Sequence, residues 1–173
     1  MSNVTVSAPE TGLFYAATPV SYKVTVAKAS PEFSFEKATM EGNVGDELEE
    51  NVLTIGLYDG DVVYTSSDDK VAEVDAVTGE VTMKAPGTVT IKATGAETNN
   101  CHAAEATYEL KVTLLGDVNG DGQVGIGDIV AITNVMAGIE KDPAIIAAAN
   151  VNGDGDVGIG DIVAVTNIMA GMK

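Results

Sequence analysis

Oxygen-bearing side chains recur at short, regular intervals in two stretches near the end of the chain. Residues 117–138 read DVNGDGQVGIGDIVAITNVMAG, and residues 150–171 read NVNGDGDVGIGDIVAVTNIMAG. The two copies are identical at 18 of 22 positions. Each has Asp or Asn at relative positions 1, 3 and 5, glycine at position 6 and Asp at position 12. Carboxylate and amide oxygens are the ligands that hard divalent cations prefer, so each copy predicts one cation site.

The spacing is that of a calcium-binding loop of the EF-hand kind. Calcium takes roughly six to eight oxygens, so a short loop must wrap around the ion, and glycine at position 6 permits the sharp turn. A single acidic stretch could also be a solvated turn, but a duplicated one with an apolar helical pattern after each copy favours two Ca²⁺ ions. The predicted ligands are Asp117, Asn119, Asp121, the carbonyl of Gln123 and Asp128 in the first loop, and Asn150, Asn152, Asp154, the carbonyl of Asp156 and Asp161 in the second.

The two loops differ in charge. Asn150 is neutral where Asp117 is charged, so the first loop has three carboxylates among its side-chain ligands and the second has two. Affinity for calcium depends on ligand charge, so the first loop is predicted to bind calcium more tightly. In both loops the closing residue is Asp, whose side chain is one methylene shorter than the Glu of most EF-hands.

A short helix is predicted after each loop, because apolar residues recur there at helical spacing. Asp128 is either the N-cap or an acid of the first turn, and Gly138 and Gly171 are natural C-terminal stops. Pro143 can open a further short helix within residues 139–149. We interpret the apolar stripes as core, packed helix against helix: Ile129, Ile132, Val135 and Met136 in the first, and Ile162, Val165, Ile168 and Met169 in the second.

The order of loop, helix, connecting segment, loop and helix resembles a type I dockerin over residues 116–173, on the duplicated DVNGDG and NVNGDG motifs with their closing Asp. The resemblance implies a small three-helix module that holds two calcium ions and binds a cohesin-like protein domain. In that family the partner contacts loop positions 10 and 11 and the following helix. The resemblance therefore implies these partner-binding residues: Ile126, Gly127, Thr133, Asn134, Ile159, Gly160, Thr166 and Asn167.

Two interpretations of Ile126 and Ile159 are open. The Ile-Gly pair stands where many dockerins have Ser or Thr, and it would contact the partner. An isoleucine at this point is equally explained by packing between the two halves of the module. The near-identity of the copies also predicts internal pseudo-two-fold symmetry, so that a partner could bind in either of two orientations.

Residues 28–113 are predicted to form a β-sandwich, because runs rich in Val, Thr and Tyr alternate with Gly, Asn and Asp turns. The stretch TSSDDKVAEVDAVTGEVTMKAPGTVTIKATG (65–95) resembles group 2 bacterial Ig-like domains, with Thr78-Gly79 in a hairpin turn. That resemblance implies a spacer or adhesive module. The expected fold is multidomain, β plus α: an Ig-like β-sandwich followed by a small all-α, dockerin-like module (114–173). Candidate strands are 4–7, 20–27, 33–35, 52–55, 62–66, 72–74, 80–84, 87–94 and 105–113.

Residues 1–27 echo the end of this β-domain. ETGLFYAATPVSYKVTV (10–26) matches ETNNCHAAEATYELKV (97–112), with Tyr22 answering Tyr108. We therefore expect residues 1–27 to be the terminal strands of a preceding Ig-like repeat, in a fragment of a larger protein. Such strands could not close a sandwich alone, so they would pair with an edge of the complete domain or be partly disordered.

The composition bounds the partners. The net charge is −17 and all nine basic residues are lysines, a field that repels nucleic acid and anionic membranes. No apolar run approaches the roughly 18 residues of a membrane helix. We expect a monomer without nucleic-acid partners or membrane insertion, located outside a bacterial cell or on its surface. Cys101 is the only cysteine, so no internal disulfide can form.

No catalytic constellation emerges from the sequence. Cys101 and His102 are neighbours, and adjacent strand residues point to opposite faces, so they do not form a nucleophile–base pair. The chain is expected to be non-catalytic. Leu114 and Leu115 lie between the two modules and are expected to be buried there, giving a semi-rigid pair.

Two functions remain. The first is a calcium-dependent assembly module, in which the dockerin-like part binds a cohesin-like partner and the Ig-like domain is a spacer. The second is a calcium-stiffened structural cap of a surface adhesin or stalk, without a cohesin partner. Exposed side chains of Ile126 and Ile159 would favour the first function, and buried ones the second.

Overall fold

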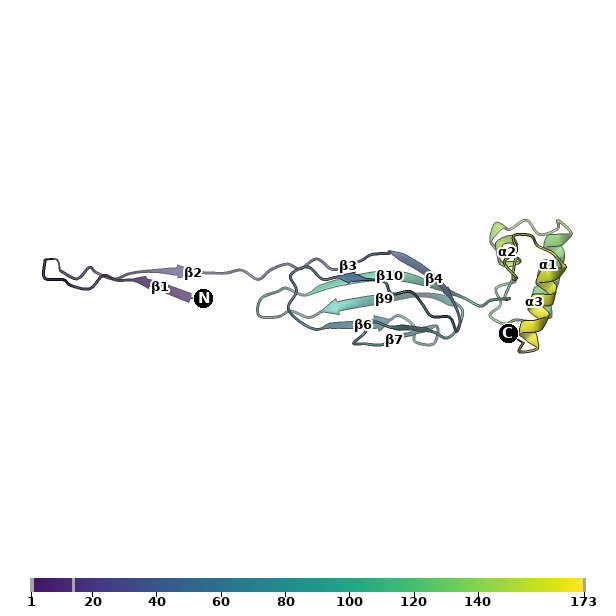
Figure 1. Cartoon of the computed structure of the whole chain (residues 1–173), viewed down its shortest axis with the longest axis horizontal. Helices are drawn as coiled ribbons and strands as arrows, with labels where there is room; N and C mark the ends of the chain where they lie inside the picture. Colours follow the sequence, from purple (N-terminus) through teal and green to yellow (C-terminus); the bar gives the residue numbers. More distant parts are fainter. Residues whose placement is uncertain (1, 14, 173) are drawn as a thin grey trace.

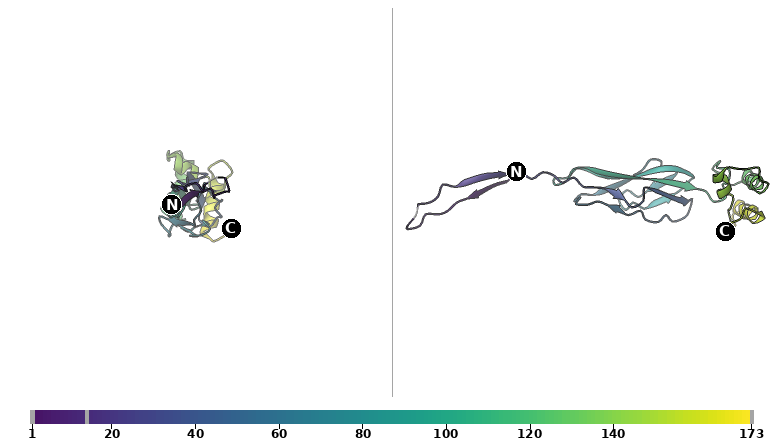
Figure 2. Two further views of the ribbon diagram at one scale, coloured as in Figure 1. Left: turned by 90° about the vertical axis from the view of Figure 1, so that its left-hand side faces the viewer. Right: turned by 90° about the horizontal axis from the view of Figure 1, so that it is seen from above.

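The computed structural model describes residues 2–13 and 15–172. A hairpin, a β-domain and a helical module follow one another along the long axis (Figures 1 and 2). The expected order, a β-region followed by a small helical region, is confirmed. The strands are β1 (Ser2–Val6), β2 (Val20–Val24), β3 (Ser34–Phe35), β4 (Thr39–Asn43), β5 (Leu53–Thr54), β6 (Val62–Ser66), β7 (Ala72–Val74), β8 (Val81–Met83), β9 (Gly87–Gly95) and β10 (Ala104–Thr113).

The central sheet of the β-domain has the order β4-β10-β9-β6. β9 is antiparallel to β10 and to β6, whereas β4 runs parallel to β10. β4 was not predicted, because Glu41, Gly42 and Asn43 are poor strand formers. Because β4 pairs along β10, this segment is extended through a tertiary contact and not through its own residue preferences. The pairs β3–β5 and β7–β8 lie outside the central sheet.

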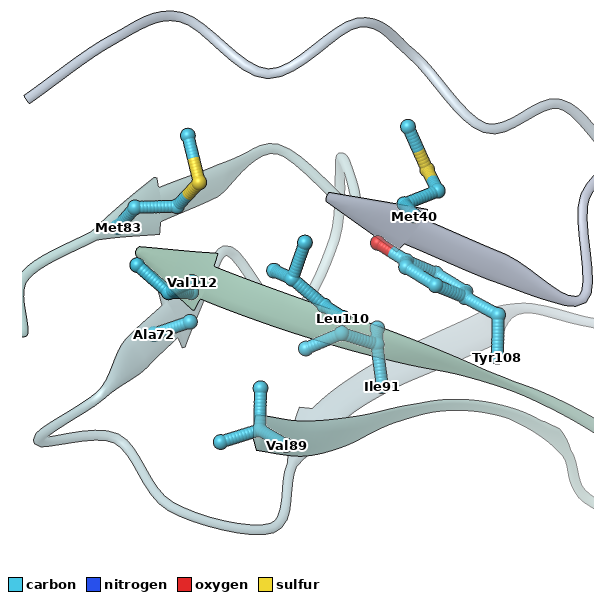
Figure 3. Packing of buried hydrophobic residues seen from close by; sticks show 8 residues of the cluster. All are labelled: Met40, Ala72, Met83, Val89, Ile91, Tyr108, Leu110 and Val112. Carbon is cyan, nitrogen blue, oxygen red and sulfur yellow. The ribbon is translucent and has the colours of Figure 1, made fainter. Parts of the chain in front are cut away.

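The core of the β-domain follows from alternation in β9 and β10. Val89 and Ile91 are buried and Thr88 and Thr90 exposed, and the same alternation continues through β10. The ring of Tyr108 packs edge-on against Phe35, with centroids 4.8 Å apart. Strands β4, β7 and β8 contribute the remaining buried side chains (Figure 3), and the cluster comprises Met40, Ala72, Met83, Val89, Ile91, Tyr108, Leu110 and Val112.

The predicted Thr78-Gly79 turn joins β7 to β8. The carboxylate of Asp75 accepts hydrogen bonds from the backbone N–H groups of Val77 (2.9 Å) and Thr78 (2.7 Å). Gly79 has φ of +78°, a conformation that residues with a Cβ rarely adopt. The two hydrogen bonds lower the pKa of Asp75, because they stabilise its charged form.

Cys101 and His102 have opposite environments. The thiol of Cys101 is buried and lies 3.3 Å from the carbonyl oxygen of Leu57, whereas His102 is exposed. A buried thiol and an exposed imidazole do not form a nucleophile–base pair. Cys101 is therefore a small buried residue. It lies beside Ala29, at the end of the β-domain where the chain arrives from β2.

The link between the β-domain and the helices differs from expectation. Leu114 is half-buried, but Leu115 is 53% exposed, so the prediction that both leucines are buried is wrong. Gly116 is buried instead. A Cβ added at Gly116 would lie 3.1 Å from both Ile168 Cδ1 and Val124 Cγ1. The first residue of the chain that is buried in the helical module is thus a glycine without a side chain, with φ of +91°, and the side chain of Leu115 lies in solvent.

The helical module contains α1 (Ile126–Met136), α2 (Pro143–Ala148) and α3 (Ile159–Met169). Pro143 opens α2 as predicted, and Asp142 caps it through a 2.8 Å hydrogen bond from the N–H of Ala144. Gly138 and Gly171 have positive φ just beyond α1 and α3, as expected for C-terminal stops. The buried core comprises Val118, Ile132, Ala149, Val151 and Val165, with Ile129, Val135, Ile162 and Ile168 packed against it.

Two members of the predicted apolar stripes are not core. Met136 and Met169 are exposed, because each is the last residue of its helix and lies beyond the packed turns. Within the described residues, none of the helices has the length and apolar character that a membrane crossing requires.

The first hairpin stands apart. β1 pairs with β2 in a two-stranded sheet, and no other described strand pairs with either. Of the two expected alternatives, pairing of this segment with an edge of the complete domain is therefore wrong. Its assignment to a preceding Ig-like repeat stays a prediction.

Candidate metal centre

The two predicted loops turn at their position-6 glycines. Gly122 has φ of +85° and Gly155 has φ of +98°. A side chain at either position would be strained, so glycine is required by the backbone path and not by space, since a Cβ at Gly155 would contact nothing within 4 Å.

Side chains at positions 1, 3 and 5 of the first loop are fixed against its own backbone. Asp117 accepts hydrogen bonds from the N–H groups of Asp121 (3.1 Å) and Gly122 (2.9 Å). Asn119 Oδ1 also accepts from the N–H of Asp121 (2.8 Å), and Asp121 Oδ1 accepts from the N–H of Gln123 (2.9 Å). The four predicted ligand residues of this segment thus form one hydrogen-bonded unit.

Asp128 ties the start of the first loop to the start of α1. It is almost fully buried, and its Oδ1 accepts from the N–H groups of Val118 (2.8 Å) and Asn119 (3.0 Å). Its Oδ2 accepts from the N–H of Gly125 at 2.7 Å. Gly125 is the N-cap, so Asp128 is the first-turn acid of the two alternatives. These bonds compensate the burial of the carboxylate.

Asp161 has the same place in the second copy. It is buried, its Oδ1 accepts from the N–H of Asn152 (3.1 Å), and its Oδ2 accepts from the N–H of Gly158 (2.8 Å). Asn152 and Asp154 repeat the backbone contacts of their counterparts in the first loop. The two copies of the sequence therefore fold into loops with equivalent hydrogen bonds at positions 3, 5 and 12.

Position 1 breaks the equivalence of the two loops. Asn150 Oδ1 is buried and accepts no hydrogen bond from any described residue. An unpaired buried oxygen costs about 1–3 kcal/mol. A cation held by the loop would supply the missing partner, so the residues present fit a calcium ion. The all-oxygen donor set also suits calcium better than zinc, which prefers nitrogen and sulfur.

Carboxylates alone do not build either site. Across residues 2–13 and 15–172, no group of three or more His, Cys, Asp or Glu side chains is gathered as a metal cluster. The carboxylates of both predicted sets accept hydrogen bonds from backbone N–H groups, and asparagine and carbonyl oxygens complete each set. The ligand assignment stays a prediction.

Glycine at position 11 has a role that sequence reasoning missed. A Cβ added at Gly127 would lie 2.6 Å from Asn119 Nδ2, and one added at Gly160 would lie 2.7 Å from Asn152 Nδ2. These glycines make room for the position-3 ligand, whereas the resemblance to dockerins implied a role in partner binding. The repeated Gly at position 11 of both copies was the available signal.

Gly127→Ala is expected to weaken calcium binding in the first loop on the order of tenfold, because its methyl group displaces Asn119. Gly125→Ala is the matched control: Gly125 is extended, with φ of −157°, and a Cβ there meets nothing within 4 Å. Competition with a calcium chelator measures both affinities. Equal losses in the two variants would contradict the proposed role of the glycine.

The first loop is expected to fill before the second in a calcium titration, because it has the extra carboxylate of Asp117. Asn150→Asp should raise the affinity of the second loop by on the order of tenfold, and Asp117→Asn should remove the advantage of the first. Chemical shifts of Gly122 and Gly155 report each loop separately. Filling of the second loop first in the unaltered chain would refute this order.

The predicted partner-binding residues lie on the outer surface of the helices. Ile126 is 71% exposed and Ile159 is 70% exposed, so packing between the two halves does not explain them. Thr133 and Thr166 are also exposed, and each hydroxyl donates a 2.7 Å hydrogen bond to a carbonyl one turn earlier. Asn167 is exposed and Asn134 is half-buried.

Two exposed residues on the same surface were missed. Val130 lies four residues after Ile126, and Val163 lies four residues after Ile159, so each pair shares a helix face. Both valines are exposed. We call the surfaces formed by Ile126, Val130 and Thr133 and by Ile159, Val163 and Thr166 the α1 face and the α3 face. The spacing of four residues was the signal in the sequence.

Comparison with known families agrees with this architecture. Residues 29–105 match the bacterial Ig-like domain (group 2), and residues 115–170 match the dockerin type I domain. The chain contains a group 2 bacterial Ig-like domain and, after it, a type I dockerin domain. Both are non-catalytic modules typical of extracellular or surface bacterial proteins. Type I dockerins bind calcium and mediate protein–protein assembly.

Among solved structures, the chain is similar to one described as the crystal structure of Drosophila N-cadherin EC1-3, with 13% sequence identity and a TM-score of 0.35. The match covers 55% of this chain and 37% of the cadherin chain. The search of curated proteins found no match.

Proposed function

We propose that the chain is a non-catalytic assembly module whose dockerin domain binds a cohesin-like domain when its two loops hold calcium, with the Ig-like domain as a spacer. The observation that carries this proposal is the exposure of Ile126 and Ile159 at equivalent points of two copies. Each isoleucine adjoins an exposed valine on its helix face, and contiguous exposed apolar side chains are typical of an interface.

Calcium would act through the starts of the helices. Asp128 joins the first loop to α1, and Asp161 joins the second loop to α3. Ile126 and Ile159 are the first residues of these helices. An ordered loop therefore fixes the point from which each docking isoleucine projects, and binding to the partner becomes calcium-dependent.

The two faces support two binding orientations. The α1 face and the α3 face carry the same residue types at the same helical positions. A cohesin-like domain that recognises one face would find nearly the same surface on the other. We propose a monomeric dockerin, outside the bacterial cell, that presents either face to one partner.

The alternative, a calcium-stiffened cap without a partner, fits less well. A structural cap is expected to bury the side chains of Ile126 and Ile159, and both are exposed.

Binding of the purified chain to a panel of bacterial cohesin domains tests the proposal. At least one cohesin should be retained with calcium and released by EGTA, and the Ile126→Asp/Ile159→Asp double variant should retain none. Absence of any calcium-dependent binding, or unchanged binding by the double variant, would favour the cap.

A further inference from the structure

The hairpin β1–β2 repeats the hairpin β9–β10. Glu97-Thr98 lies 87 residues after Glu10-Thr11, and the same offset carries Val4 to Ile91. In the structure Val4 pairs with Tyr22, and Ile91 pairs with Tyr108. The two tyrosines are the residues that the sequence echo aligns, so the two hairpins share one pairing register.

One face of β1–β2 is apolar and the other is polar. Paired residues of an antiparallel ladder have side chains on the same face, and alternate residues continue that face. Thr5 and Ser21, on the polar face, have their hydroxyl oxygens 2.9 Å apart. The apolar face comprises Val4, Val6, Val20, Tyr22 and Val24.

The equivalent face of β9–β10 is covered. Ile91 and Tyr108 are buried in one cluster with Ala72 of β7 and Met83 of β8, which lie outside the central sheet, and with Met40 of β4, which extends that sheet beside β10 (Figure 3). The strands β4, β7 and β8 belong to the same Ig-like repeat and precede β9 in the chain. The complete domain therefore shows that an apolar face of this kind packs against earlier strands of its own Ig-like repeat.

The same face of β1–β2 is uncovered. Val4, Val6, Val20 and Tyr22 are all exposed. The hairpin stands at the opposite end of the molecule from the helices, clear of the β-domain (Figure 1). A two-stranded hairpin with an open apolar face is marginally stable in water.

We propose that this apolar face packs against the strands of a second Ig-like repeat, equivalent to residues 29–88 and carried earlier on the same polypeptide. Residues 2–28 then close a β-sandwich of their own. A second copy of the hairpin face fits less well, because it would not supply equivalents of β4 and β6, which pair with the outer edges of β10 and β9. The spacer before the dockerin is then an array of at least two Ig-like repeats.

The test fuses a copy of residues 29–88 directly before Ser2, in place of Met1. Residue 88 precedes the equivalent of Ser2 in the complete domain, so the fusion restores one full repeat. Hydrogen exchange is followed at the β1 and β2 amides in the 173-residue chain and in the fusion. We expect near-unprotected exchange in the first and exchange slower by on the order of 100-fold in the second. Tyr22→Asp in the fusion should abolish this protection, and Ser21→Asp, on the polar face, should retain it.

Three results would overturn the proposal. The first is strong protection of β1 and β2 in the 173-residue chain itself. The second is protection that rises with protein concentration, which would assign the face to a dimer. The third is a fusion in which the added segment stays unfolded and the hairpin stays unprotected, while residues 29–172 are folded.

Discussion

Excess EGTA will unfold the dockerin domain and leave the Ig-like domain folded. The dockerin core consists of five buried residues, Val118, Ile132, Ala149, Val151 and Val165, of which three are next to predicted ligands in sequence. So small a core rarely holds a fold without metal or disulfide. Far-ultraviolet circular dichroism should lose the helical signal of α1, α2 and α3, since the apo module lacks the binding free energy that stabilises it.

The Ig-like domain is the internal control for this experiment. Its core contains larger side chains, such as Ile91, Tyr108 and Leu110, and none of the predicted ligands. Its melting transition should therefore be unchanged by EGTA, whereas the transition of the dockerin should return on addition of calcium. An identical spectrum and melting curve with and without EGTA would refute the calcium-binding role of the loops.

Substitution of both docking isoleucines will weaken cohesin binding far more than substitution of either one. Ile126→Asp alone leaves the α3 face intact, so the affinity should fall by only about twofold, the loss of one of two equivalent orientations. The double variant with Ile159→Asp has no intact face and should lose affinity on the order of 100-fold. Isothermal titration in the presence of calcium measures each affinity.

Val77→Asp is the control for the new negative charge. Val77 is an exposed apolar residue in the β7–β8 turn of the Ig-like domain, so the variant should bind as the unaltered chain does. Complete loss of binding in Ile126→Asp alone would show that only the α1 face docks. The assembly function would then stand, and the two-orientation model would fall.

The sequence predicted those features that depend on local pattern. Alternation placed β9 and β10, and the spacing of Asp, Asn and Gly residues placed both loops and the start of each following helix. Pro143 and Gly138 marked helix ends, because their backbone preferences are intrinsic to the residue. Family resemblance to the two domains was visible from the same motifs.

Features that depend on tertiary contacts were not predictable in this way. β4 exists because β10 offers it a parallel edge, not because TMEGN favours a strand. Leu115 is exposed and its neighbour Gly116 is buried, which the sequence pattern does not indicate. The role of Gly127 depends on where the side chain of Asn119 lies, which no spacing rule states.

Gly116 has a mechanical consequence for a tether. A Cβ added at this buried glycine would lie 3.1 Å from Val124 of the first copy and 3.1 Å from Ile168 of the second, so the chain enters the module between its two halves. We expect a pulling force along the chain to reach both halves together, because both pack around the residue at which the chain enters the module.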